Sequence, residues 1–229
     1  MATFALVHGA WHGAWCWERL TPELEQEGHQ VVAVDLPAED PTAGLTRYAE
    51  LTEEALGDAD DVIVVGHSLG AGSIPIVATL RPIRHLVFLC GLLPEPGKSV
   101  TDRYQTEDVF VPGFAGNTVT LEDGASAWPD REPAVRCFFH DCTEADADWA
   151  FARLRPQSAA PRREPWPLDA IPDVERTSIL GRDERCIRPD WSRTVSRELL
   201  GVEAVELDSA HSPFLSRPRE LADVLLRIA

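Results

Sequence analysis

The chain has 229 residues, a formal net charge of −17 and five cysteines. This length suits a single α/β domain with an ample core, and the negative charge argues against a nucleic-acid partner, whose phosphates would be repelled. No apolar run is long enough to cross a membrane, no signal peptide is apparent at the start, and scattered cysteines suit reduced thiols in a cytoplasm.

Short apolar runs alternate with helical patterns along most of the chain. Such alternation predicts a mostly parallel, six-stranded, doubly wound sheet with helices on both faces. The strands are expected at Thr3–Val7, Gln30–Asp35, Asp61–Val65, His85–Leu89, Thr177–Leu180 and Val202–Leu207.

The loop after the first strand is rich in glycine and aromatic residues. It spans His8 to Trp15, and a loop of this kind can direct backbone N–H groups into the cleft at the carboxyl end of a sheet. We expect the N–H of Ala10 to be one donor of an oxyanion hole. His8 and His12 are expected to brace the loop by hydrogen bonds rather than to react.

The third strand leads into a second glycine-rich turn, Gly66-His67-Ser68-Leu69-Gly70. A buried strand, G-x-S-x-G and a helix in this order are typical of the nucleophile elbow of α/β-hydrolases. The pattern predicts Ser68 as a nucleophile and the N–H of Leu69 as the second oxyanion donor. The alternative is an ordinary turn in which Ser68 caps a helix.

Residues 92–172 interrupt the alternation and are rich in proline, tryptophan and phenylalanine. We expect this segment to be a cap inserted over the carboxyl ends of the strands, and residues 1–91 and 173–229 to form the core. A pocket for a small to medium ester is predicted between the two. The expected substrate-binding residues are Trp11, Leu92, Phe110 and Trp128.

A serine nucleophile needs a base, and the base needs a carboxylate that orients it. In this fold the chain order is serine, acid, histidine, and His211 is the only histidine after His140. The acid should follow the strand at Thr177–Leu180, which favours Asp183. The rival carboxylates are Glu184, Asp190 and Asp208.

These motifs resemble the methylesterase and hydroxynitrile lyase branch of the α/β-hydrolase superfamily, in a bacterial-looking version. The resemblance runs from end to end and is most specific in the first block, His8 to Trp17. It implies Ser68, Asp183 and His211 as the triad. Lyases of this branch have a threonine at the position of Gly9 and a lysine at that of Ser212, so the resemblance favours an esterase.

The sequence therefore predicts a serine esterase that acts through an acyl-enzyme and needs no metal or organic cofactor. Two alternatives are a hydroxynitrile lyase-type enzyme on the same triad and a small-ligand receptor that has kept its triad. The expected partner is a small-molecule ester, with neither nucleic acid nor membrane bound, and a homodimer is compatible with the sequence. The natural acyl and alcohol groups are not specified by these patterns.

Overall fold

A single six-stranded sheet forms the centre of the computed structural model, which describes residues 1–229. The strand order is β2-β1-β3-β4-β7-β8, and every neighbouring pair is parallel. The strands are β1 (Thr3–Val7), β2 (Gln30–Val34), β3 (Val62–His67), β4 (His85–Leu89), β7 (Glu175–Gly181) and β8 (Val205–Leu207). The predicted parallel sheet is confirmed.

The middle of the sheet is apolar on both faces. All residues of β1 and β3 are buried, because helices cover the strands from both sides. This explains why Val62 to Val65 reads as a continuous apolar run rather than an alternating one.

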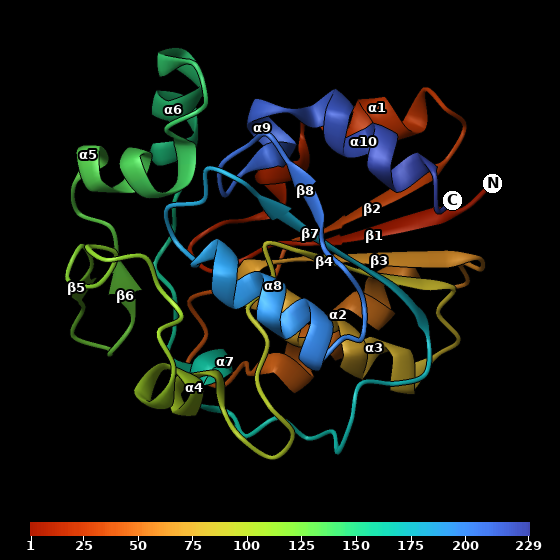
Figure 1. Cartoon of the computed structure of the whole chain (residues 1–229), viewed down its shortest axis with the longest axis horizontal. Coiled ribbons are helices and arrows are strands. Elements are labelled where there is room, and N and C mark those ends of the chain that lie inside the picture. The colour runs from red at the N-terminus through yellow and green to blue at the C-terminus, as the bar shows by residue number, and fades with distance from the viewer.

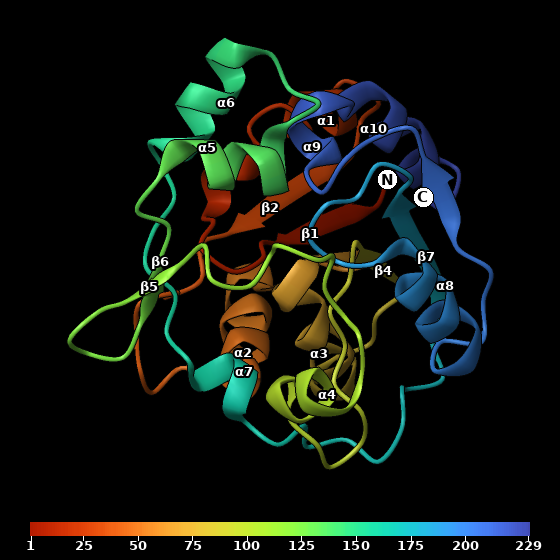
Figure 2. The same cartoon turned by 60° about the vertical axis from the view of Figure 1, so that its left-hand side comes forward.

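Helices lie in two layers, one on each face of the sheet (Figures 1 and 2). On one face pack α1 (Thr21–Glu25), α9 (Pro213–Ser216) and α10 (Pro218–Leu226). On the other lie α2 (Leu45–Leu56), α3 (Ile74–Leu80) and α8 (Pro189–Glu198). Two short 3₁₀ helices, η1 (Ala14–Trp17) and η2 (Ser68–Gly72), follow β1 and β3.

The helix expected after Ser68 is divided into η2 and α3, and the helical segment after the loop at His8 to Trp15 is likewise divided into η1 and α1. In both cases a proline lies in the first turn of the second helix, where its missing N–H costs nothing.

The segment between β4 and β7 adds no strand to the central sheet, and most of its helices and its hairpin lie at the carboxyl ends of the strands (Figure 1). Its division from the core at residues 92 and 172 stays a prediction. The segment itself contains more helices and strands than the sequence indicates. Its elements are α4 (Val100–Thr106), a hairpin of β5 (Val119–Thr120) and β6 (Ser126–Ala127), α5 (Arg131–Ala134), the π-helical turn η3 (Val135–Phe139), α6 (Glu144–Phe151) and α7 (Ala160–Arg163).

Aromatic side chains join this segment to the core. Trp11, in the loop after β1, packs edge-on against Trp128 with 5.7 Å between ring centroids, and its Nε1 donates to the backbone oxygen of Ser126. Trp11 also lies 5.9 Å from Phe138. This segment and the central sheet therefore share one apolar cluster.

None of the helices combines the length and the apolar character that a membrane span requires.

Candidate active site

Ser68 occupies the sharp turn between β3 and η2. Its φ of 48° lies in the left-handed region, which is strained for a residue with a side chain. The turn also needs small neighbours. A Cβ on Gly66 would lie 2.7 Å from both Ala71 Cα and Ile74 Cγ2, and one on Gly70 would collide with the carbonyl oxygen of His8. The predicted elbow is present, and it exposes Ser68 to a cavity.

Ala10 and Leu69 both line this cavity beside Ser68. The N–H of Ala10 donates to no acceptor in the protein. Leu69 is the second residue of η2, so its N–H belongs to a first helical turn, where intrahelical acceptors are missing. The structure thus brings together the two donors predicted for an oxyanion hole.

Three buried histidines surround these two turns and hold them. His8 Nδ1–H donates to Gly9 O at 2.9 Å while its Nε2 accepts from the N–H of Leu36, and His12 Nδ1–H donates to Ala10 O at 2.8 Å. Burial lowers the pKa of His8 to about 4 and that of His12 to about 3. Burial likewise lowers the pKa of His67, whose Nε2–H donates to His211 O at 3.0 Å. All three are neutral braces at pH 7, as predicted for His8 and His12.

His211 lies in the loop after β8 and also lines the cavity. Its Nδ1 is 2.7 Å from Glu184 Oε2, and both side chains are almost fully buried, at 2% and 3% exposure. An ionised carboxylate only accepts hydrogen bonds, so Nδ1 carries the proton and the Nε2 lone pair is left to act as a base. Ser68 Oγ is not hydrogen-bonded to His211 here, and in ligand-free sites this bond is often long.

The prediction that Asp183 contacts His211 is wrong. Asp183 is 66% exposed and pairs at 3.0 Å with Nε2 of His140, a residue of the segment between β4 and β7. The chain turns after β7. At this turn the N–H of Asp183 donates to the carbonyl oxygen of Ser209, which belongs to the loop after β8. That turn sends Asp183 outward and the next residue, Glu184, inward.

The other two rival carboxylates are on the surface. Asp190 is 86% exposed and pairs with Arg193 in the first turn of α8, and Asp208 pairs with Arg182. Neither contacts His211, so the structure leaves Glu184 as the acid that does.

One cluster of potential metal ligands lies within the site. Ligand atoms of Cys90, Glu184 and His211 lie within 4.8 Å of one another. A zinc ion would hold two such ligands more than about 3 Å apart, whereas His211 and Glu184 touch at 2.7 Å. Burial and then the Glu184 charge raise the pKa of the Cys90 thiol, so it is protonated and a poor ligand. This cluster suits a hydrogen-bonded pair rather than a metal.

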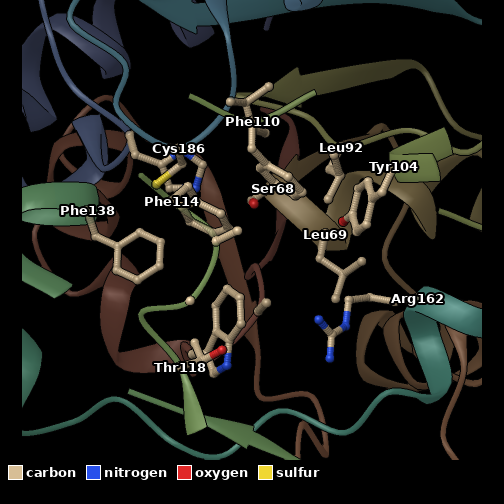
Figure 3. Close-up of a pocket in the computed structure, with 16 residues that line it drawn as sticks. Ser68, Leu69, Leu92, Tyr104, Phe110, Phe114, Thr118, Phe138, Arg162 and Cys186 are labelled. Atoms are coloured by element: carbon tan, nitrogen blue, oxygen red, sulfur yellow. The ribbon is translucent and has the colours of Figure 1, made fainter. Parts of the chain in front are cut away.

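The cavity has a volume of about 250 Å³ and mainly apolar walls (Figure 3). Of the predicted substrate-binding residues, Trp11, Leu92 and Phe110 line it. Trp128 does not; it is buried and packs edge-on against Trp11 and against Phe138, with 4.8 Å between the centroids of the latter pair. Its proposed contact with substrate is therefore corrected to a packing role.

Three polar residues of the cavity wall, Tyr104, Thr118 and Arg162, have no signal in the sequence. Tyr104 belongs to α4 and Arg162 to α7, and Figure 3 shows both on the same side of the cavity as Leu69. Both helices are short and lie in the segment without regular periodicity. No sequence pattern therefore indicated that these two side chains meet.

Comparison with known proteins agrees with this architecture. A family model described as "Alpha/beta hydrolase family" matches residues 4–224. The chain belongs to the α/β-hydrolase family. Along 98% of its length this α/β-hydrolase is 28% identical to a protein from Arabidopsis thaliana named "Methylesterase 3", of which the match covers 94%.

Two further relatives show how the similarity is distributed. The α/β-hydrolase is also 28% identical over 99% of its length to an "Alpha-hydroxynitrile lyase" of Arabidopsis thaliana, 96% of which is covered. Its fold matches the crystal structure of polyneuridine aldehyde esterase with a TM-score of 0.85 at 24% identity, covering 100% of this chain and 99% of that one. The resemblance to the methylesterase and hydroxynitrile lyase branch is thus confirmed. Since an esterase and a lyase match equally well, the residues of the site must separate the two activities.

Proposed function

We propose that this α/β-hydrolase is a serine esterase for small to medium carboxylic esters, with Ser68, His211 and Glu184 as its triad. The observation that carries the proposal is the buried 2.7 Å contact between His211 Nδ1 and Glu184, at a cavity that also exposes Ser68. A neutral imidazole held in this tautomer is what a serine nucleophile needs to lose its proton.

The first half-reaction acylates Ser68. His211 Nε2 takes the hydroxyl proton while Oγ bonds to the ester carbonyl carbon, and the N–H groups of Ala10 and Leu69 stabilise the oxyanion. Glu184 stabilises the imidazolium that forms. The tetrahedral intermediate then collapses: the carbon–oxygen bond to the alcohol breaks, and the alcohol leaves with the proton from His211.

The second half-reaction returns the enzyme to its starting state. Water gives a proton to His211 Nε2 and its oxygen bonds to the acyl carbon. Collapse of the second tetrahedral intermediate breaks the bond to Ser68 Oγ, which regains the proton. One ester and one water thus yield one acid and one alcohol, with no cofactor consumed.

Two positions disfavour the lyase alternative. A Cβ at position 9 would lie 2.8 Å from Ser68 Cβ, so Gly9 leaves the nucleophile unobstructed where the related lyases have a threonine. Cyanide, as a departing anion, needs a cation beside the base, and the residue after His211 is the buried, uncharged Ser212. The guanidinium of Arg162 lies on the side of the cavity opposite Phe138, whose ring packs against His211. The site therefore fits ester hydrolysis better than cyanohydrin cleavage.

The proposal is tested with a panel of short methyl and aryl esters, with mandelonitrile as the lyase substrate and the Ser68→Ala variant as control. We expect repeated turnover of esters that falls by about 10⁴-fold or more in Ser68→Ala, and one equivalent of a serine-directed phosphonate bound at Ser68. Serine-dependent cyanide release would replace the proposal with the lyase, and a single burst of product without steady turnover would replace it with the receptor.

The cellular location forms part of the same proposal. All five cysteines are free thiols, and four of them are buried. This supports the cytoplasmic location expected from the sequence, because thiols persist in reducing compartments.

A further inference from the structure

Arg162 places a cation inside the predominantly apolar cavity. It is the third residue of α7, and Figure 3 shows its guanidinium directed into the cavity on the side opposite Phe138. Its Nε is buried without a hydrogen-bond partner, and its Nη2 reaches only Ser126 Oγ, at 3.4 Å. The guanidinium therefore has donors to spare in a place that excludes most water.

No carboxylate neutralises this cation. None of the residues that line the cavity is acidic, and Arg162 forms no ion pair within the protein. Burial lowers the pKa of the Arg162 guanidinium, and the nearby Arg163 lowers it further, although a guanidinium stays charged at any ordinary pH. A partly buried, unpaired charge is costly to the fold, which points to a ligand that supplies the opposite charge.

Tyr104 provides a second polar group on the same side of the cavity (Figure 3). Its ring is fixed against Phe110, with 4.6 Å between centroids. Burial raises the pKa of the Tyr104 hydroxyl, so it stays protonated and can donate a hydrogen bond. Arg162 and Tyr104 together offer several donors and no acidic group.

The chemistry of the triad indicates which part of the ester faces these donors. His211 gives its proton to the leaving alcohol, so the alcohol lies on the His211 side. Phe138 marks that side, because its ring centroid is 5.6 Å from that of His211. The acyl group then extends the other way, past Leu69 toward Tyr104 and Arg162.

We propose that Arg162, assisted by Tyr104, binds a carboxylate carried by the acyl group, so that the preferred substrates are half-esters of dicarboxylic acids. This inference rests on the proposed esterase function and adds the class of acyl group. A bidentate guanidinium–carboxylate pair fits the geometry of both groups.

The test compares matched pairs of methyl esters that differ only in the terminal charge. Monomethyl succinate, glutarate and adipate are paired with methyl butyrate, valerate and hexanoate. For each pair, the ratio of kcat/KM for the charged ester to kcat/KM for the neutral ester is measured at pH 8.

Three variants separate a binding role from a structural one. Arg162→Met removes the charge but keeps much of the length, and we expect it to lower the ratio about 10- to 100-fold, the range for losing a charge-assisted hydrogen bond. Arg162→Lys should restore part of the preference. Arg163→Met makes the same charge change at the exposed neighbouring residue and should leave the ratio as in the native enzyme.

A binding measurement makes the result independent of turnover. Calorimetric titration of Ser68→Ala with glutarate and adipate should show binding that is lost when Arg162→Met is added. If esters are hydrolysed but the ratio does not depend on Arg162, the carboxylate subsite is refuted and the esterase stands. If the dicarboxylates bind through Arg162 and no ester is turned over, the esterase fails and the subsite stands. Equal losses on charged and neutral esters, with a lower Tm, would show that Arg162 is structural and refute the subsite.

Discussion

At the scale of single residues, the site depends on which of two adjacent carboxylates faces His211. Glu184 accepts the Nδ1–H of His211 on one oxygen and the N–H of Cys186 on the other, at 2.7 Å each. Its partners therefore fix both the position and the orientation of the carboxylate. Asp183, one residue earlier, is solvent-exposed and contacts His140.

Glu184→Gln and Asp183→Asn form a matched pair for this assignment. In Glu184→Gln the amide can donate to Nδ1, which moves the imidazole proton to Nε2 and leaves no base for Ser68. We expect kcat for ester hydrolysis to fall on the order of 10³- to 10⁴-fold, whereas Asp183→Asn should stay within a few-fold of the native enzyme. Steady-state kinetics on one good ester would decide, and the reverse order of effects would return the role of acid to Asp183.

The sequence could predict Ser68 and His211 because each has an unambiguous local signal. Ser68 lies in a motif between a strand and a helix, and no later histidine competes with His211. The sequence favours Asp183, one residue before the carboxylate that contacts His211, because the direction of a side chain in a turn depends on backbone dihedrals that composition does not encode. Spacing alone places Glu184 among the rival carboxylates and does not select it.

At the scale of secondary-structure elements, the elbow and the loop after β1 are packed backbone against backbone. Gly70 in η2 has no room for a side chain because the carbonyl of His8 lies against it. This contact sets the separation between the two N–H groups proposed to bind the oxyanion. Small residues at the elbow are therefore needed for two reasons: they allow the sharp turn, and they allow the two loops to approach each other closely.

Gly70→Ala and Gly72→Ala test this contact within one short helix. The methyl group of Gly70→Ala meets rigid backbone, so we expect a loss of about 1–3 kcal/mol in the free energy of unfolding together with a lower kcat. A Cβ on Gly72 would lie 3.0 Å from Leu45 Cδ1, the end of a flexible side chain, and should cost less. Urea denaturation and ester kinetics on both variants would show the contrast; equal effects would contradict the proposed role of the Gly70 contact.

The core strands were predicted closely, whereas the wall of the cavity was not. β1 and β4 have the bounds expected from the sequence, since buried parallel strands are continuous apolar runs. α4 and α7 are short and lie among irregular segments, so no periodicity placed Tyr104 and Arg162 in the cavity. The aromatic composition of residues 92–172 places Trp128 among the expected pocket residues, but composition does not distinguish a residue that lines a cavity from one packed against its wall.

At the scale of the whole molecule, the buried histidines couple folding to pH. His8, His12 and His67 have folded-state pKa values below 6.5. At pH values between 6.5 and these folded pKa values, the three imidazoles therefore bind protons in the unfolded chain but not in the folded protein. The resulting stability is fully present above pH 6.5. It is lost as the pH falls toward about 4 and about 3, the folded pKa values of His8 and His12.

We therefore expect the free energy of unfolding to decrease below pH 6.5, by up to about 1.4 kcal/mol per pH unit for each of these histidines. His12→Gln should make this dependence shallower. Urea denaturation between pH 7.5 and pH 5 measures the slopes, and identical slopes in the native protein and His12→Gln would contradict the explanation.

The hydrogen bond from Cys186 N–H to Glu184 has a consequence for protein engineering. Cys186 and Ile187 line the cavity. The same loop pairs with the segment between β4 and β7, where Val111 N–H donates to Cys186 O. Mutant libraries that vary positions 186 and 187 to change the substrate range would also disturb the carboxylate behind His211. Libraries at Tyr104 and Phe114 would alter the shape of the cavity without touching that carboxylate, and they are the sounder starting point for redesign.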